Sequence, residues 1–214
     1  MKIGYLVPGR SFEPEEGARR RRILESFQSG DLTITMLESD EGPPAIESAE
    51  DEAAAIPSLV ELAQTHEDAF DVFITGCFAD VGIEELRKNV SIPIIGPGRA
   101  AYAVAGAAHP TFAILAINLY SVTEERGKMK TFGFSNQEVV IRSLDLHVAT
   151  IIDEPEQALM QITNAAQQCH APAFIPGCMS MAFLLEEHNI VDVGITRVVN
   201  PLRCAIRLAV AITS

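Results

Sequence analysis

Short, nearly continuous apolar runs alternate with longer amphipathic segments along the whole chain. Apolar runs of this length are typical of strands that are buried on both faces of a parallel sheet. They predict strands at residues 2–7, 32–37, 72–75, 92–95, 112–117, 139–144, 173–175 and 195–199. The segments between them predict helices at residues 14–28, 48–66, 83–90, 123–132, 155–168 and 201–212, with two further helices after Gly96 and after Cys178.

Several residues mark where the predicted helices begin or break. Pro14 suits a first helical position, because its missing N–H group would have no partner there. Ser48 is a good N-cap for the helix that follows, and Asp51 stands three residues on, close to a capping box. Pro57 is expected to kink or interrupt that helix, since proline removes an internal hydrogen bond.

The alternation of strands and helices predicts an α/β fold with parallel sheets and right-handed crossovers. One order of elements also occurs twice. Residues 74–80 (Ile-Thr-Gly-Cys-Phe-Ala-Asp) and residues 174–180 (Phe-Ile-Pro-Gly-Cys-Met-Ser) each end an apolar run in Gly-Cys. Each is followed by a helical segment, a strand and a helix that opens at a proline. The repeat indicates two related lobes.

The repeat also predicts the domain boundaries. The first lobe is expected to span residues 1–97 plus 201–214 and to carry Cys77, and the second to span residues 98–200 and to carry Cys178. The chain would cross between the lobes near Gly96 and near Asn200. Because ligands of α/β sheets bind at the carboxyl ends of the strands, a cysteine just past such a strand would open into a binding crevice.

Composition narrows the classes of partner. The chain has 214 residues, of which 48% are hydrophobic, and a net charge of −13. Such a charge argues against nucleic acid and against an anionic membrane surface, both of which attract basic proteins. The basic run at residues 19–22 lies in an acidic helix and is interpreted as a solvated face. Neither a nucleic acid nor a membrane is therefore expected as a partner.

The chain shows no sign of export or of a membrane span. Met1 and Lys2 lead straight into a strand, and no apolar run is long enough to cross a bilayer. The four cysteines lack C-x-x-C spacing, which argues against a zinc site and against a disulfide framework. We therefore expect a cytoplasmic protein with reduced thiols and no metal.

Two thiols in equivalent positions suggest acid–base chemistry. A thiol pKa near 8.5 falls when the sulfur meets a helix N-terminus. A thiolate and a thiol on opposite faces of a carbon can remove a proton from one side and return one to the other. Free cysteines more often simply pack in the core, and Cys169 and Cys204 fit that interpretation. The repeated Gly-Cys favours a catalytic role for Cys77 and Cys178.

Three stretches resemble one known family, the aspartate/glutamate/hydantoin racemase superfamily, and within it the hydantoin racemase-like branch. Residues 42–48 (Gly-Pro-Pro-Ala-Ile-Glu-Ser) are similar to its Gly-Pro-x-x-Ile-Glu-Ser loop. Residues 77–83 (Cys-Phe-Ala-Asp-Val-Gly-Ile) resemble its Cys-Phe-Gly-Asp-Pro-Gly-Leu. Residues 177–179 resemble its second Gly-Cys, and Asn200-Pro201 stands where the family usually has Asp-Pro.

This resemblance implies two pseudo-symmetric α/β lobes with an active site in the cleft between them. It implies inversion without a cofactor, with Cys77 and Cys178 as the catalytic pair. The substrate would carry an acidic C–H beside a carbonyl, as hydantoins, allantoin and amino acids do. The resemblance also implies a homo-oligomer.

The chain departs from the family at two polar positions. The first strand commonly ends in Asn-Pro-Asn-Ser/Thr in the family, but here residues 7–11 read Val-Pro-Gly-Arg-Ser. A Thr-Thr pair in the second lobe is replaced by Ala116 and Ile117, followed by Asn118. Arg10 can hold a carboxylate with two hydrogen bonds, so it favours an acid substrate over a neutral ring. An exposed loop charge is the alternative interpretation of Arg10.

The expected substrate-binding residues come from both lobes. They are Arg10, Ser11, Phe78, Met179 and Asn118. Phe78 and Met179 would form an apolar wall beside the cysteines, or else belong to the core. Two other functions stay open: a cis–trans isomerase or decarboxylase of the same superfamily, and a non-catalytic small-molecule binding protein.

Overall fold

A computed structural model describes residues 1–134 and 137–213. The chain forms two compact units. Unit 1 contains Met1–Pro97 and the residues from Ala205 onward, and unit 2 contains Gly98–Cys204. The chain leaves unit 1 inside helix α4 (Pro97–Ala108) and returns to it inside helix α9 (Pro201–Thr213).

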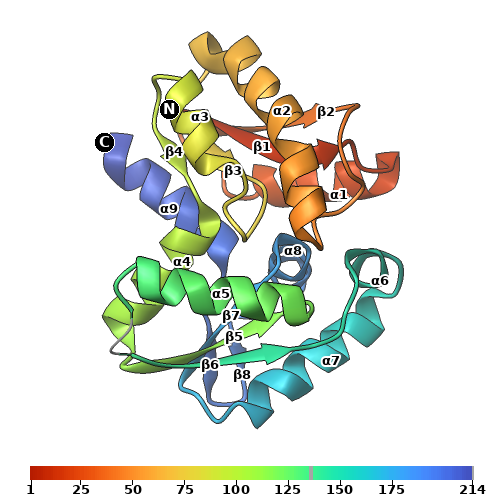
Figure 1. Cartoon of the computed structure of the whole chain (residues 1–214), viewed down its shortest axis with the longest axis vertical. Helices are drawn as coiled ribbons and strands as arrows, with labels where there is room; N and C mark the ends of the chain where they lie inside the picture. Colours follow the sequence, from red (N-terminus) through yellow and green to blue (C-terminus); the bar gives the residue numbers. More distant parts are fainter. Residues whose placement is uncertain (135–136, 214) are drawn as a thin grey trace. The chain divides into compact units, whose positions relative to one another are not determined.

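Unit 1 contains a parallel sheet with the strand order β2-β1-β3-β4 (Figure 1). Its strands are β1 (Lys2–Arg10), β2 (Thr33–Ser39), β3 (Val72–Thr75) and β4 (Ile94–Ile95). Its other elements are α1 (Pro14–Glu25), α2 (Ala49–His66), a short 3-10 helix η1 (Glu67–Ala69) and α3 (Ile83–Asn89). Helices α2 and α3 pack over Leu6 and Phe73, which makes one face of the sheet a core.

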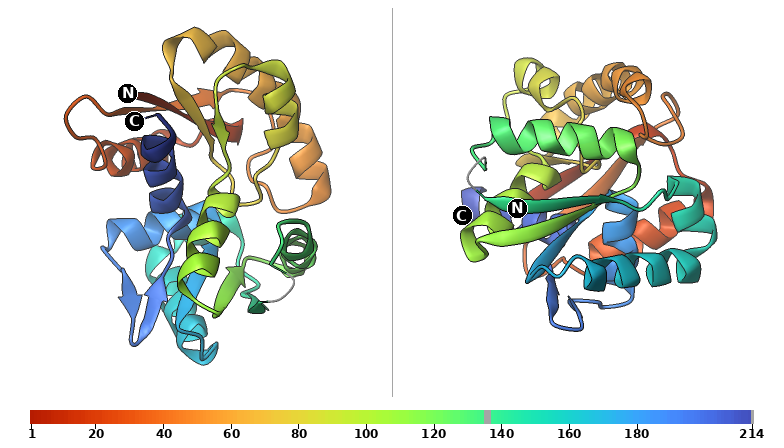
Figure 2. Two further views of the ribbon diagram at one scale, coloured as in Figure 1. Left: turned by 90° about the vertical axis from the view of Figure 1, so that its left-hand side faces the viewer. Right: turned by 60° about the horizontal axis from the view of Figure 1, so that its bottom comes forward.

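Unit 2 contains a mostly parallel sheet with the strand order β6-β5-β7-β9-β8, in which only the β8–β9 pair is antiparallel. Its strands are β5 (Thr111–Ala116), β6 (Glu138–Ser143), β7 (Ala173–Gly177), β8 (Asp192–Val193) and β9 (Thr196–Val198). Its further helices are α5 (Leu119–Thr131), α6 (Val148–Asp153), α7 (Pro155–Gln168) and α8 (Met179–Glu187). Figure 2 shows α7 running along this sheet, where α6, α7 and α8 bury Leu115 and Phe174.

The predicted α/β class with parallel sheets and flanking helices is confirmed. The N-cap at Ser48 is also confirmed, because the Asp51 N–H group donates to Ser48 Oγ at 3.2 Å. The Asp51 carboxylate in turn accepts from the Glu47 N–H group at 3.1 Å. The two bonds satisfy backbone donors at the start of α2, as a capping box does.

Three local predictions differ from the structure. Helix α2 is not interrupted at Pro57, one of the two effects expected there, because Pro57 and Ala53 lie on an exposed face where water can serve the carbonyl that loses its partner. Strand β1 extends beyond the predicted end at residue 7 as far as Arg10, with a register shift between Leu6 and Arg10 and a left-handed Gly9 (φ 100°). Helix α6 and strand β8 were not predicted, since both are short.

Candidate active site

The glycines before the two cysteines occupy equivalent places in the two sheets. A Cβ atom on Gly76 would lie 2.7 Å from the carbonyl oxygen of Leu6 on β1. A Cβ atom on Gly177 would lie 2.7 Å from the carbonyl oxygen of Leu115 on β5. Each glycine therefore lets its strand end closely against the central strand beside it. The repeated Gly-Cys is a structural repeat, and it delivers each cysteine to the carboxyl end of a parallel strand.

Cys77 opens a tight turn after β3. The Asp80 N–H group donates to the Cys77 carbonyl at 3.0 Å, and the Ile83 N–H group donates to the Asp80 carbonyl at 3.3 Å. Asp80 has a left-handed backbone (φ 58°) and is 7% exposed. Helix α3 begins only at Ile83. Cys77 thus precedes a helix, as expected, but a turn separates the two.

Cys178 is the N-cap residue of α8. Its backbone is extended, and its carbonyl accepts the first helical hydrogen bond from the Ala182 N–H group at 3.0 Å. The backbone N–H groups in the first turn of a helix lack helical partners, so the field near this thiol favours a negative charge. The sequence prediction of a cysteine at a helix N-terminus describes Cys178 more closely than Cys77.

Two expected binding residues lie at the end of β1, the strand that pairs with β3. Arg10 is exposed, and its N–H group donates to the Pro43 carbonyl at 3.1 Å. In the described residues, the Arg10 guanidinium forms no ion pair. The Ser11 hydroxyl donates to the Ser39 carbonyl at 2.9 Å, so it helps to hold the end of β2. Unit 1 therefore brings Arg10, Ser11 and Cys77 to one edge of its sheet.

The expected binding residues of unit 2 lie at the ends of β5 and β7, which also pair. Asn118 follows β5 and caps α5, where its Oδ1 accepts from the Ser121 N–H group at 2.9 Å. Met179 follows Cys178 and is 3% exposed, and Phe78, beside Cys77 in unit 1, is also 3% exposed. Both apolar side chains are therefore buried neighbours of the thiols.

Asn200 has a structural role at the start of α9. Its Nδ2 group donates to the Ala182 carbonyl at 2.9 Å, and its Oδ1 accepts from the Leu202 N–H group at 2.9 Å. The side chain is 5% exposed. An amide serves this position well because it donates to α8 and accepts from α9 at the same time.

The other two cysteines differ from the repeated pair. No disulfide joins any of the four cysteines, all of which lie in the described residues. Cys169 is the C-cap of α7, where burial raises the pKa of its thiol and the nearby Arg142 guanidinium partly opposes that rise. Cys204 is buried inside α9. Neither follows a strand of a sheet, in keeping with the packing role expected of them.

Sequence reasoning passed over two residues beside Cys77. Asp80 belongs to the family-like motif but was not chosen as a site residue; its left-handed φ and its burial carry no periodic signal. Thr75 ends β3, is fully buried, and has a hydroxyl group without a hydrogen-bond partner in the part of the chain that the structure describes. Burying a hydroxyl group without a hydrogen-bond partner costs folding free energy. The sequence shows no sign of this burial, which is seen only in the structure.

Two further findings concern metals and membranes. Within residues 1–134 and 137–213, no group of three or more histidine, cysteine, aspartate or glutamate side chains is placed to hold a metal ion. In the same residues, no helix combines the length and the apolar character needed to span a bilayer.

Comparison with known proteins identifies the family. The model of the Asp/Glu/hydantoin racemase family matches residues 20–209, a stretch that contains both Gly-Cys sites. The chain belongs to this family. Membership confirms the family that the motifs suggested, and it agrees with the expectation of an isomerase.

Individual members of the racemase family are similar over most of the chain. A hydantoin racemase of Pseudomonas sp. (strain NS671) is 23% identical over 187 residues, which are 85% of this chain and 74% of that protein. The structure of an allantoin racemase from Pseudomonas fluorescens is 19% identical and has a TM-score of 0.85, covering 100% of this chain and 91% of that one. An allantoin racemase from Klebsiella pneumoniae is 20% identical and has a TM-score of 0.84, with 99% and 87% covered.

Proposed function

We propose that this racemase-family protein is a cofactor-independent racemase or epimerase in which Cys77 and Cys178 are the two acid–base groups. The observation that carries the proposal is the matched pair of Gly-Cys sites. A Cβ atom on either glycine would lie 2.7 Å from a carbonyl oxygen of the neighbouring central strand, and each cysteine follows at the carboxyl end of its own strand. Ligands of α/β sheets bind at those ends.

The proposed reaction needs one proton transfer on each face of the substrate carbon. One cysteine, as the thiolate, removes the proton from the carbon beside the carbonyl, and the electron pair moves onto the carbonyl oxygen. The other cysteine, as the thiol, donates a proton to the opposite face of the same carbon. The pair ends with its protonation states exchanged, so the reverse reaction uses the same groups in swapped roles.

We propose that the substrate carries a free carboxylate and that Arg10 binds it. Arg10 is exposed at the carboxyl end of β1, next to the strand that leads to Cys77, and in the described residues no acidic side chain pairs with it. A guanidinium group binds a carboxylate through two parallel hydrogen bonds. The matched relatives are named for hydantoin and allantoin, so a neutral or ureido substrate is the competing class.

The test is proton exchange in deuterium oxide, followed by NMR together with optical rotation. The panel contains 5-substituted hydantoins, allantoin, aspartate, glutamate and other amino acids. We expect deuterium at one carbon and loss of optical rotation for one class, and we expect Cys77→Ala and Cys178→Ala each to abolish inversion. Cys169→Ala is the matched control and keeps the parent rate.

Several outcomes would overturn the proposal. A single variant at Cys77 or Cys178 that racemises at the parent rate would exclude the two-base mechanism. A covalent adduct on one thiol with an unsaturated diacid would favour a cis–trans isomerase, and carbon dioxide release would favour a decarboxylase. Tight binding without turnover, unchanged when both cysteines are replaced by serine, would favour a binding protein.

A further inference from the structure

A groove in unit 2 lies between the edge strand β6 and helix α7. Its volume is about 270 Å³. Arg142 and Ser143 line it from the end of β6, and Gln161, Asn164 and Gln168 line it from α7. The three α7 residues are spaced so that they share one face of the helix. The groove is thus bordered by hydrogen-bonding side chains on both sides.

The groove is positively charged, whereas the protein as a whole is negatively charged. The chain carries a net charge of −13, yet among the described residues no aspartate or glutamate lines the groove. Arg142 forms no ion pair with any residue that the structure describes. Its polar neighbour is the thiol of Cys169. The guanidinium therefore keeps its charge available to a ligand.

The remaining side chains supply further hydrogen-bond donors. Ser143 Oγ accepts from the Asp145 N–H group at 3.3 Å, which leaves the hydroxyl proton free to donate. No bond to another described side chain engages the amides of Gln161, Asn164 and Gln168. Each amide NH₂ group offers two donors. An arginine with amide donors opposite it is a suitable environment for an oxyanion.

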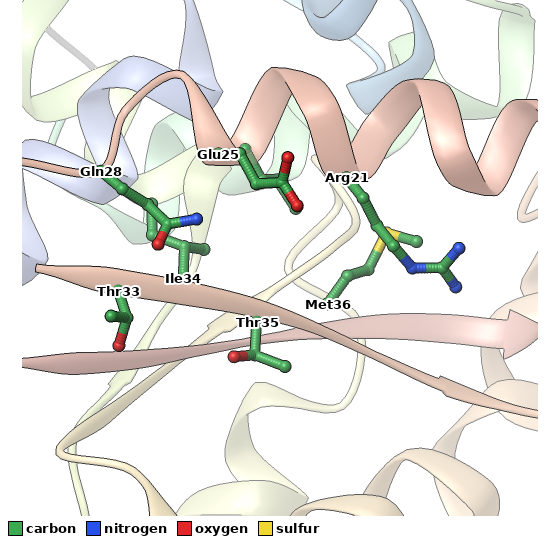
Figure 3. Close-up of a pocket in the computed structure, with 8 residues that line it drawn as sticks. Arg21, Glu25, Gln28, Thr33, Ile34, Thr35 and Met36 are labelled. Atoms are coloured by element: carbon green, nitrogen blue, oxygen red, sulfur yellow. The ribbon is translucent and has the colours of Figure 1, made fainter.

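A second pocket differs from the β6–α7 groove in its charged side chains. It has a volume of about 380 Å³ and lies between α1 and β2, where Ile34 and Met36 point toward the helix (Figure 3). Glu25 lines that pocket, and Arg21 is already paired with Glu38. Its arginine is thus neutralised and an acid stands beside it, so it does not select an anion. The β6–α7 groove has neither feature.

We propose that the β6–α7 groove binds a small carboxylate anion. Arg142 holds the carboxylate through two parallel hydrogen bonds, and the amides of α7 bind the rest of the ligand. A carboxylate fits better than a phosphate, because one planar guanidinium matches its two oxygens and balances its single charge. Neither Cys77 nor Cys178 lines the groove, so the test of this site does not depend on turnover.

The test is isothermal titration of the intact protein with acetate, succinate and phosphate, with urea as the neutral control. We expect a carboxylate to bind and Arg142→Gln to weaken the affinity about tenfold or more, the loss of one charge-assisted contact. Arg126→Gln removes an exposed arginine from α5 of the same unit and should leave the affinity unchanged. Asn164→Leu, which keeps Arg142, should also weaken binding.

A second measurement uses the cysteine beside the groove. The rate of Cys169 alkylation, followed by peptide mass spectrometry, should fall when a saturating carboxylate covers Arg142. Equal binding by the parent and Arg142→Gln, tighter binding of phosphate than of carboxylates, or no binding below about 10 mM would overturn the proposal. A signal lost with Arg10→Gln and kept with Arg142→Gln would belong to the candidate active site and would also overturn it.

Discussion

The Asp80 carboxylate lies against the Cα atom of Gly96, so a Cβ atom on residue 96 would stand 2.4 Å from Asp80 Cγ. This contact joins the turn that begins at Cys77 to the end of β4. Asp80 also donates its N–H group to the Cys77 carbonyl. The position of the candidate catalytic turn therefore depends on a residue without a side chain, sixteen positions beyond Asp80 in the sequence.

Gly96→Ala is expected to displace that turn. The new methyl group would collide with a buried carboxylate held in a left-handed turn, which should cost about 1–3 kcal/mol of stability. Chemical denaturation measures the cost, and the alkylation rate of Cys77 reports the turn. Gly127→Ala is the control: nothing lies within 4 Å of its Cβ position, and it should stabilise α5 by about 0.5–1 kcal/mol. If Gly96→Ala and Gly127→Ala changed the stability equally, the close contact between residue 96 and Asp80 would be contradicted.

Gly76→Ala and Gly177→Ala are expected to be destabilising by similar amounts. In each case the obstacle is a backbone carbonyl at 2.7 Å, which cannot rotate away as a side chain can. We expect each to cost at least about 2 kcal/mol, through overpacking against the central strand. Thermal unfolding of the two variants tests this. If one is tolerated and the other is not, the two Gly-Cys sites are not structural equivalents.

Thr75→Val is expected to raise stability by about 1 kcal/mol, because it replaces an unpartnered buried hydroxyl with a methyl group of similar size. The measurement is the denaturant midpoint, with Thr65→Val as the comparison. The Thr65 hydroxyl donates to the Glu61 carbonyl at 2.8 Å on an exposed helix face, so little change is expected there. A loss of stability in Thr75→Val would show that the hydroxyl has a partner in solution.

The Glu67 carboxyl is expected to make the stability of the fold fall as the pH is lowered. Hydrogen bonds from the Ser91 hydroxyl and backbone hold the pKa of the Glu67 carboxyl below its usual range. Because the pKa is lower in the folded protein, the ionised Glu67 carboxylate stabilises the fold. This stabilisation is fully present above the pKa that Glu67 has in the unfolded chain, and it is lost as the pH falls through the pKa of the folded protein. Ser91→Ala should therefore reduce stability at neutral pH and have less effect in acid. Unfolding curves measured from neutral pH down to a pH of about 3, below the ordinary pKa of a glutamate carboxyl, test this.

Arg10→Gln is expected to change the KM of acid substrates but not that of neutral ones. If Arg10 binds a carboxylate, the variant should raise KM for carboxylate substrates about tenfold or more and leave neutral hydantoins unaffected. Arg10→Lys should recover part of the loss, since it keeps the charge without the two-pronged geometry. An identical change of KM for both substrate classes would assign Arg10 a structural role at the end of β1.

Much of this fold can be predicted from the sequence because its elements produce repeating sequence patterns. Buried parallel strands are continuous apolar runs, and the two Gly-Cys sites recur at the ends of such runs. Asp80 and Gly96 could not be paired in this way, because their contact depends on a left-handed backbone and a close approach between distant residues. The continuity of α2 at Pro57 could not be predicted for a related reason: whether a proline interrupts a helix depends on whether water can reach the carbonyl that loses its partner.

Unit 1 is built from two segments of the chain that unit 2 separates in the sequence. Unit 1 takes its strands from the first ninety-seven residues, but Ala205 and the remainder of α9 also belong to it, and Thr213 contacts Met1. During synthesis, all of unit 2 therefore leaves the ribosome before unit 1 is complete. The strands of unit 1 are made well before the α9 residues that belong to the same unit. A premature stop after Cys204 would spare every residue of unit 2 and leave the first-made unit unfinished.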